Sequence, residues 1–383
     1  MALKGVKVIE IAGLAPAPHA GMILADFGAK VIRVDRVQQM LASDRLARGK
    51  LSVALDLKMP EGLEAFKRVS KDADVLIEPF RPGVMERMGL GPAIMMKENP
   101  RLIYARLSGF GQDGPWNKMA GHDINYVSMS GVLSLLGRKG ENPAPPLNLI
   151  ADFAGGGLMC AMGILMALFE RTKSGLGQVI DANLVSGTAY VSSWLWMGRD
   201  LGVCGEDRGS NLLDTGAPFY ETYRTLDGKF MAVGALEPQF YMQFLQGLGL
   251  SEDNDLPFQM SKEDWPHMKQ TFARIFVTKT QAEWTRIFSN TDACVTPVLT
   301  RDEAAEHPQN KVMGNFLKNT KGAHEPTPAP ILSRTPAMPT SMAQPEIGQD
   351  TQTVLAEVGY SQEDIEKLIA SGAAEIGQVS SKL

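Results

Sequence analysis

The stretch Val6-Lys7-Val8-Ile9-Glu10-Ile11 opens the pattern that decides the fold. It is a short apolar run of the kind that forms a buried strand. A Gly- and Pro-rich loop follows at 13–18, then a helical segment at 20–27 that ends at Gly28, and a second apolar run at 31–34. A strand, a helix and a strand in this order predict an α/β fold, with a parallel sheet and helices on its faces.

Further apolar runs bounded by turn residues continue this pattern along the chain. We expect strands at 51–57, 74–78, 101–107 and 177–182, and a helix at 61–69. The acidic Asp35 after the second run is typical of dinucleotide-binding folds. However, the first loop lacks the GxGxxG glycines that allow a pyrophosphate to approach, which argues against a dinucleotide cofactor.

A second domain is predicted by the change of pattern after residue 190. Residues 191–218 contain many Gly, Asp and Asn residues and are expected to form a linker. The alternating stretch 219–224, the turn Asp227-Gly228 and the stretch 229–233 are typical of a β-hairpin. We therefore expect a large domain at 1–190 and a small α+β domain at 219–325.

The last part of the chain is expected to return to the large domain. A Pro-rich stretch at 325–345 is typical of a linker. Helices within 326–383 would then complete the large domain, and Ser361 with Asp364 predicts a capping box at the start of the last one.

Composition excludes several classes of protein. The 383 residues are 44% hydrophobic, enough for two or three cores, and the net charge of −5 argues against a nucleic-acid surface. Three scattered cysteines and five isolated histidines predict neither a disulfide framework nor a bound metal. No apolar run reaches the length of about 20 residues that a membrane span needs, so we expect no membrane span.

Four cationic residues lie at or near the carboxyl ends of strands of the predicted sheet. They are Arg36, Lys58, Arg81 and Arg106. Each alone could be a solvated surface charge. Ligands of open parallel sheets bind at the carboxyl ends of the strands, so their recurrence there suggests an anion site.

Two acid/base side chains frame the middle of the chain. Gly121-His122-Asp123-Ile124-Asn125-Tyr126 precedes one apolar segment, and Ala151-Asp152-Phe153-Ala154 leads into three glycines at 155–157 and an apolar helix at 158–169. Both His122 and Asp152 are expected to begin a helix, with Asp152 as an N-cap. Each is often only structural. Beside a glycine run that lets a backbone or ligand come close, the pair suggests general acid/base catalysis.

These motifs, together with Ala25-Asp26-Phe27-Gly28-Ala29 and Gly177-Gln178-Val179-Ile180-Asp181-Ala182, resemble the family III CoA-transferase superfamily, and in particular its racemases. The resemblance covers essentially the whole chain. It implies an interlocked homodimer whose subunits each have a large Rossmann-like domain and a small domain. It also implies racemisation of 2-methylacyl-CoA thioesters through an enolate, in branched-chain fatty acid and bile acid metabolism.

The resemblance also implies the site residues. His122 and Asp152 would be the acid/base pair, with Glu237 brought beside them by the partner's small domain. We expect CoA, as part of the substrate and without a further cofactor, to contact Arg36, Leu55, Asp56, Leu57, Lys58, Arg81, Gly121, Asp123, Ile124, Asn125 and Tyr126.

Two other functions remain open from the residues. A CoA-transferase of this superfamily would use Asp152 as a nucleophile and form an acyl anhydride, but it needs no second base at His122. A non-catalytic acyl-CoA-binding protein would need neither residue.

The sequence ends in Ser381-Lys382-Leu383, the tripeptide that the peroxisomal import receptor binds. We therefore expect a peroxisomal location and that receptor as a partner. A second, mitochondrial pool is the alternative, but residues 1–20 carry only two lysines and no arginine, a poor composition for a transit peptide.

Overall fold

The structure, a computed structural model, describes residues 1–38, 44–251 and 255–377. The chain divides into two units. The first comprises Met1–Ser130, Pro146–Val191 and the described residues from Gly314 onward; the second comprises Gly131–Pro145 and Ser192–Met313. Residues 131–145, which we had expected in the large domain, therefore group with the second unit. The expected linker and domain boundaries otherwise stay a prediction.

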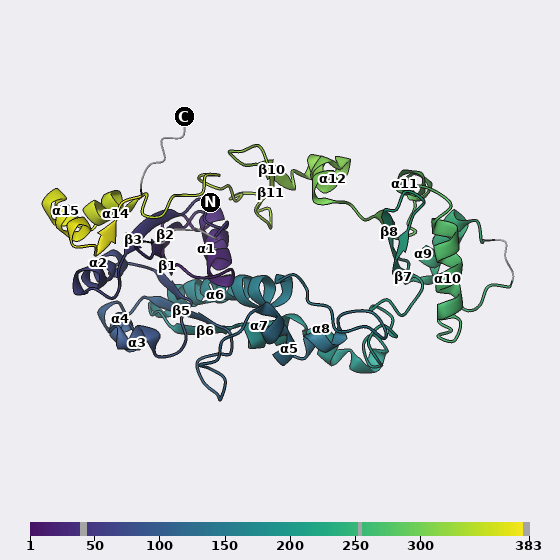
Figure 1. The fold of residues 1–383 in the computed structure, drawn as a ribbon, viewed down its shortest axis with the longest axis horizontal. Helices are drawn as coiled ribbons and strands as arrows, with labels where there is room; N and C mark the ends of the chain where they lie inside the picture. Colours follow the sequence, from purple (N-terminus) through teal and green to yellow (C-terminus); the bar gives the residue numbers. More distant parts are fainter. Residues whose placement is uncertain (39–43, 252–254, 378–383) are drawn as a thin grey trace. The chain divides into compact units, whose positions relative to one another are not determined.

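A seven-stranded sheet forms the centre of the first unit (Figure 1), in the order β12-β3-β2-β1-β4-β5-β6. Its strands are β1 (Lys7–Ile11), β2 (Lys30–Asp35), β3 (Leu51–Leu55), β4 (Val75–Glu78), β5 (Ile103–Ser108), β6 (Val179–Asn183) and β12 (Ala374–Glu375). All neighbours are parallel except β12, which is antiparallel to β3. The six predicted strands and the parallel α/β sheet are confirmed.

Strands β1 to β5 are buried along almost their whole length, whereas the edge strand β6 is partly exposed. Burial on both faces explains why the central strands are mostly apolar rather than strictly alternating. On one face, Ile9 of β1 and Ile32 of β2 are register partners in a core that also takes in side chains of α2, α3, α4, α14 and α15. Residues of the opposite parity face α1 and α6; among them, Glu10 is completely buried. Helices on both faces make this a doubly wound sheet.

The helices of the first unit are α1 (Pro16–Asp26), α2 (Pro60–Ser70), α3 (Val84–Arg87), α4 (Pro92–Glu98), α5 (Asp123–Met129), the π-helical η2 (Leu149–Leu158), α6 (Met159–Ser174), α7 (Leu184–Val191), α14 (Thr351–Glu357) and α15 (Gln362–Ala370). A hairpin of β10 (Phe316–Lys318) and β11 (His324–Pro326) completes it. The capping box of Ser361 and Asp364 at α15 is confirmed.

The prediction that residues 13–18 form a loop is wrong in its second half. The helix begins at Pro16, four residues before the predicted start. Proline is tolerated in the first helical turn because its missing N–H would have no intrahelical partner there. Proline therefore favoured a loop in the sequence, while its actual role here is to start α1.

The second unit has a three-stranded antiparallel sheet in the order β7-β8-β9. Its elements are η1 (Val132–Leu135), α8 (Ser193–Met197), η3 (Arg199–Leu201), β7 (Tyr220–Arg224), β8 (Phe230–Gly234), α9 (Pro238–Leu248), α10 (Trp265–Phe276), α11 (Gln281–Phe288), β9 (Val295–Pro297), α12 (Arg301–Glu306) and α13 (Pro308–Met313). The predicted hairpin is confirmed as β7 and β8, and an aromatic core lies between the sheet and α9, α10 and α11.

One helical stretch is longer and more apolar than we expected. Leu149–Ser174, which joins η2 to α6, is 26 residues long and by length and composition alone could cross a membrane. However, 44% of its most apolar window is buried inside the fold, and the core helix of a soluble protein passes the same test. It is therefore weak evidence for a membrane span.

Candidate active site

Asp152 lies in the first part of the wide helix η2 rather than at its N-cap, so the N-cap prediction is wrong. The helix begins at Leu149, preceded by Asn148 in the left-handed backbone region (φ 62°). Asparagine tolerates that conformation better than most residues. The Asn148 side chain then donates from Nδ2 to Asp152 Oδ2 at 2.9 Å. The sequence analysis missed Asn148, although its spacing of four residues from Asp152 was a usable signal.

His122 lies at the N-cap of α5, as predicted. Its backbone N–H donates to the Asn125 side-chain oxygen at 3.0 Å, which fixes the start of the helix and leaves the His122 ring exposed. The next residue, Asp123, points the other way and is buried. Its Oδ2 accepts the backbone N–H groups of Ala151 at 2.8 Å and Asp152 at 2.9 Å. The starts of α5 and η2 are thus joined.

A hollow of about 300 Å³ in the first unit is lined by both His122 and Asp152. Its other walls are Ala12, Gly13, Leu14, Pro16, Pro79, Phe80, Leu107, Ser108, Gly109, Gly121, Tyr126 and Leu184. The structure therefore brings the two predicted acid/base residues into one small, largely apolar space, 30 positions apart in the sequence.

The place of this hollow follows from the topology of the sheet. Ala12 follows β1, Pro79 follows β4 and Gly109 follows β5, so the hollow lies at the carboxyl ends of the strands. The chain winds outward from β1 to β2 and β3 on one side, then crosses to β4 on the other side. Crevices form at such a switch point, because the connections leave in opposite directions.

Burial dominates the electrostatics of Asp152. The residue is 7% exposed, and this desolvation raises the pKa of its carboxyl group above the ordinary value. The Asn148 hydrogen bond lowers the Asp152 pKa, the Asp123 charge raises it and the His122 charge lowers it. Burial therefore outweighs the effect of the helix terminus, which stabilises an ionised carboxylate by only about 0.3–1 kcal/mol.

The three glycines after Asp152 serve backbone packing rather than ligand binding. A Cβ at Gly155 would approach the backbone nitrogen of Thr188 in α7 to 2.6 Å, and one at Gly157 would approach Nδ1 of His19 in α1 to 2.6 Å. None of the three lines the hollow. They let η2 pack closely against α1 and α7.

Of the four cationic residues that were predicted to form an anion site, three are exposed and the fourth is already bound to carboxylates. Arg36, Lys58 and Arg81 lie in the turns after β2, β3 and β4 with exposed side chains, and the structure gives none of them an ion pair within its described residues. Arg106 is 8% exposed and is bound to Glu78 at 2.9 Å and Glu86 at 2.8 Å. Arg106 is therefore a structural residue, and the anion site predicted from it is wrong in that member.

The remaining predicted residues are placed as follows. Leu55 is buried in the core, Leu57 packs against it, and Asp56 Oδ1 accepts the Lys58 backbone N–H at 2.9 Å. Ile124 is exposed, and the Tyr126 hydroxyl donates to the Gly121 carbonyl at 2.5 Å. Glu237 is the N-cap residue of α9 in the second unit. The ligand contacts of these residues stay predictions.

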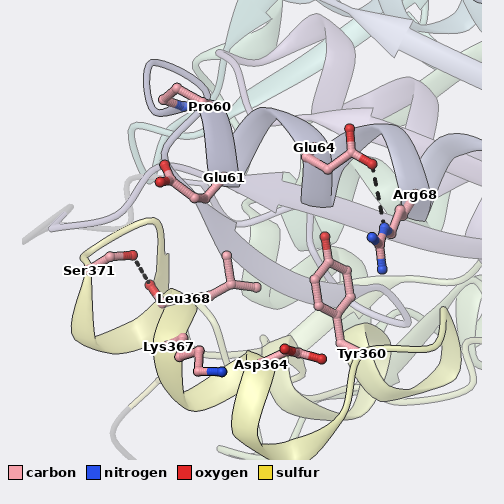
Figure 2. A pocket seen from close by; sticks show the side chains of 9 residues that line it. All are labelled: Pro60, Glu61, Glu64, Arg68, Tyr360, Asp364, Lys367, Leu368 and Ser371. Carbon is pink, nitrogen blue, oxygen red and sulfur yellow. Dashed lines mark hydrogen bonds and ion pairs between the residues drawn. The ribbon is translucent and has the colours of Figure 1, made fainter.

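A larger hollow of about 580 Å³ lies between α2 and α15 (Figure 2). Within it, Arg68 Nε donates to Glu64 Oε1 at 3.5 Å, and the Arg68 guanidinium lies 4.5 Å from the centre of the Tyr360 ring. None of the predicted site residues lines it. Although this hollow is larger, the predicted acid/base pair lines the smaller one.

Comparisons with known proteins agree on one family. The profile of CoA-transferase family III matches residues 3–351. The chain is 57% identical over 383 residues to "Alpha-methylacyl-CoA racemase" of Homo sapiens and 56% identical over 383 residues to that of Mus musculus, with 100% of each chain covered. The crystal structure of a CAIB/BAIF family protein from Brucella suis matches with a TM-score of 0.78 at 25% identity, covering 93% of this chain and 99% of that one.

Proposed function

The chain belongs to CoA-transferase family III, and on that premise we propose that it is a racemase that interconverts the (2R) and (2S) forms of 2-methylacyl-CoA thioesters. The full-length similarity to alpha-methylacyl-CoA racemases supports this activity. The observation that carries the proposal is the hollow shared by His122 and Asp152. CoA enters as part of the substrate, and no further cofactor takes part.

In the proposed reaction, the carbon next to the thioester carbonyl, C2, loses one proton and then gains another. One residue of the pair removes the C2 proton, and the electron pair moves onto the carbonyl oxygen to give an enolate. The other residue then delivers its proton to the opposite face of C2. The enolate returns its electrons, the thioester is restored, and no bond to sulfur breaks.

The protonation states of the two residues must differ before the reaction starts. Neutral His122 with protonated Asp152 carries one transferable proton, and imidazolium with ionised Asp152 carries the same number. The raised pKa of Asp152 brings these two states closer in free energy. A substrate that dries the hollow would raise that pKa further.

The CoA-transferase activity of the same family is the alternative. There the Asp152 carboxylate would attack the thioester and release CoA, and an acceptor acid would be required. Incubation of the acyl-CoA in deuterated water separates the two: a racemase introduces deuterium at C2 without an acceptor. A transferase needs the acceptor, and a binding protein leaves the ester unchanged.

Arg36 is proposed to bind a CoA phosphate, since its exposed guanidinium follows the carboxyl end of β2. We expect Arg36→Ala to raise KM for several acyl-CoA esters more than it lowers kcat, because phosphate contacts stabilise ground and transition states alike. Arg68→Ala, in the hollow between α2 and α15, is the control with an unchanged KM. If Arg36→Ala also leaves every KM unchanged, Arg36 is only a surface charge.

A homodimer is proposed as the working form, with the partner's Glu237 beside His122 and Asp152, as the family resemblance implies. Large apolar side chains on the outside of α6 support association: Met166 and Phe169 are 60% and 66% exposed. An exposed apolar face of this kind is typical of an interface. A monomeric mass in sedimentation equilibrium at micromolar concentration would contradict the dimer.

Import into peroxisomes is proposed through Ser381, Lys382 and Leu383, which lie outside the described residues. A fluorescent protein fused before Met1 is expected to give punctate peroxisomal fluorescence that becomes diffuse when these three residues are deleted. Diffuse fluorescence from the intact chain would contradict a peroxisomal location. Mitochondrial fluorescence would support the mitochondrial location instead.

A further inference from the structure

The Asp123 carboxylate lies beneath the two proposed bases. Its side chain is only 1% exposed, and it follows His122 directly at the start of α5. One oxygen, Oδ2, accepts both the Ala151 and the Asp152 backbone N–H, at 2.8 and 2.9 Å. A single carboxylate therefore ties the segment that carries one base to the segment that carries the other.

We propose that Asp123 is a positioning residue for proton transfer, whose side chain sets the place of the Asp152 carboxyl group relative to His122 and does not contact CoA. The inference rests on the proposed racemase function. It assigns the side chain to positioning and leaves the CoA contact that the family resemblance implied for this residue to the backbone.

The first N–H groups of a helix have no partner within that helix, and here they are buried. Without Asp123 these groups at the start of η2 would be unsatisfied, and the first turn would be free to shift. Hydrogen bonds to an ionised carboxylate are also shorter and stronger than neutral ones. The next residue, Phe153, packs edge-on against the His19 ring of α1 with 5.2 Å between the ring centres.

Asp123 also contributes negative charge to the site. The groups that act on Asp152 are the dominant burial, then the Asn148 side chain, the Asp123 carboxylate and the His122 ring; the Tyr126 phenol also faces it. Asp123 raises the Asp152 pKa, whereas Asn148 and His122 lower it. Removing the Asp123 charge should therefore lower the Asp152 pKa.

Two substitutions separate position from charge. In Asp123→Asn the amide oxygen can still accept both N–H groups, so exchange should stay within about tenfold of wild type. The pH limb due to Asp152 should move to lower pH. In Asp123→Ala both functions are lost. There kcat should fall about 10²-fold with little change in KM, as expected for a misplaced catalytic group. Asp113→Asn, an exposed aspartate of the same unit, is the matched control.

The readout is exchange of the C2 proton with deuterated water, measured from each enantiomer across pH. One enantiomer exchanges its C2 proton through Asp152 and the other through His122. We expect Asp123→Ala to slow the exchange that depends on Asp152 more than the exchange that depends on His122. An unchanged kcat in Asp123→Ala, an unshifted limb in Asp123→Asn, or a raised KM at constant kcat would overturn the proposal. Thermal melting checks folding, and Asp123→Asn keeps the test valid if the alanine variant does not fold. No exchange by the wild type would refute the racemase function itself.

Discussion

His122→Ala and Asp152→Ala are each expected to lower the kcat of racemisation by roughly 10²-fold or more, the scale of a lost general acid or base. The reason is that racemisation needs both residues in each direction, one to take the proton and one to give it. Each variant should still exchange the C2 proton of the enantiomer that the remaining base reaches. The measurement is circular dichroism or chiral separation of the product, combined with mass spectrometry of deuterium uptake.

His267→Ala, an exposed histidine in the second unit, serves as the control and should leave kcat unchanged. Full racemase activity in either His122→Ala or Asp152→Ala would refute the two-base assignment. Loss of exchange from both enantiomers in a single variant would instead indicate one base that serves both faces.

Lys50→Met is expected to lower the free energy of unfolding by about 3–5 kcal/mol. Lys50 Nζ donates to Glu10 Oε2 at 2.7 Å and to the Pro18 carbonyl at 2.8 Å, and both charged side chains are completely buried behind β1. Methionine fills similar space but leaves the Glu10 carboxylate without its counter-charge. Urea unfolding at several pH values measures the effect.

The contribution of Glu10 to the free energy of unfolding depends on pH in a definite direction. Burial raises the pKa of Glu10 above its ordinary value despite Lys50, so this carboxyl group binds a proton more tightly in the folded state than in the unfolded state. Stability then falls as pH rises, and losing Lys50 should make the deficit larger at pH 8 than at pH 5. Adding Glu10→Gln should recover part of the loss. Lys30→Met, from the exposed pair with Glu357, should cost under about 1 kcal/mol. An equal small loss in both lysine variants would contradict the buried-pair argument.

The sheet was predictable from the sequence because each parallel strand is a short apolar run, and its period and length do not depend on distant residues. The cap of α15 was predictable for the same reason, since Ser361 and Asp364 lie three residues apart. The prediction of helix boundaries was ambiguous where one residue type occurs in two kinds of local structure. Pro16 starts a helix instead of breaking the chain, and Asp152 lies inside a helix that Asn148 begins.

The candidate site was predictable in its acid/base pair but not in its supporting contacts. Arg106 was grouped with the other cations because its place near the carboxyl end of a strand suggested a ligand-binding role. Only the fold reveals that Glu78 and Glu86 neutralise it. Asp123 was assigned to CoA because the family resemblance implied contacts along residues 121–126, while the two hydrogen bonds that its side chain accepts come from residues 28 and 29 positions away. Sequence spacing cannot reveal partners that meet only through tertiary packing.

Deuterium uptake from each pure enantiomer tests the racemase assignment most directly. The (2R)- and (2S)-2-methylacyl-CoA esters are incubated separately with the protein in deuterated water, without any acceptor acid, and followed by chiral separation and mass spectrometry. We predict that both converge on the same mixture of enantiomers and that deuterium appears at C2 in each. A chiral centre that stays unchanged and undeuterated, with thioester exchange appearing only when an acceptor acid is added, would contradict the racemase function.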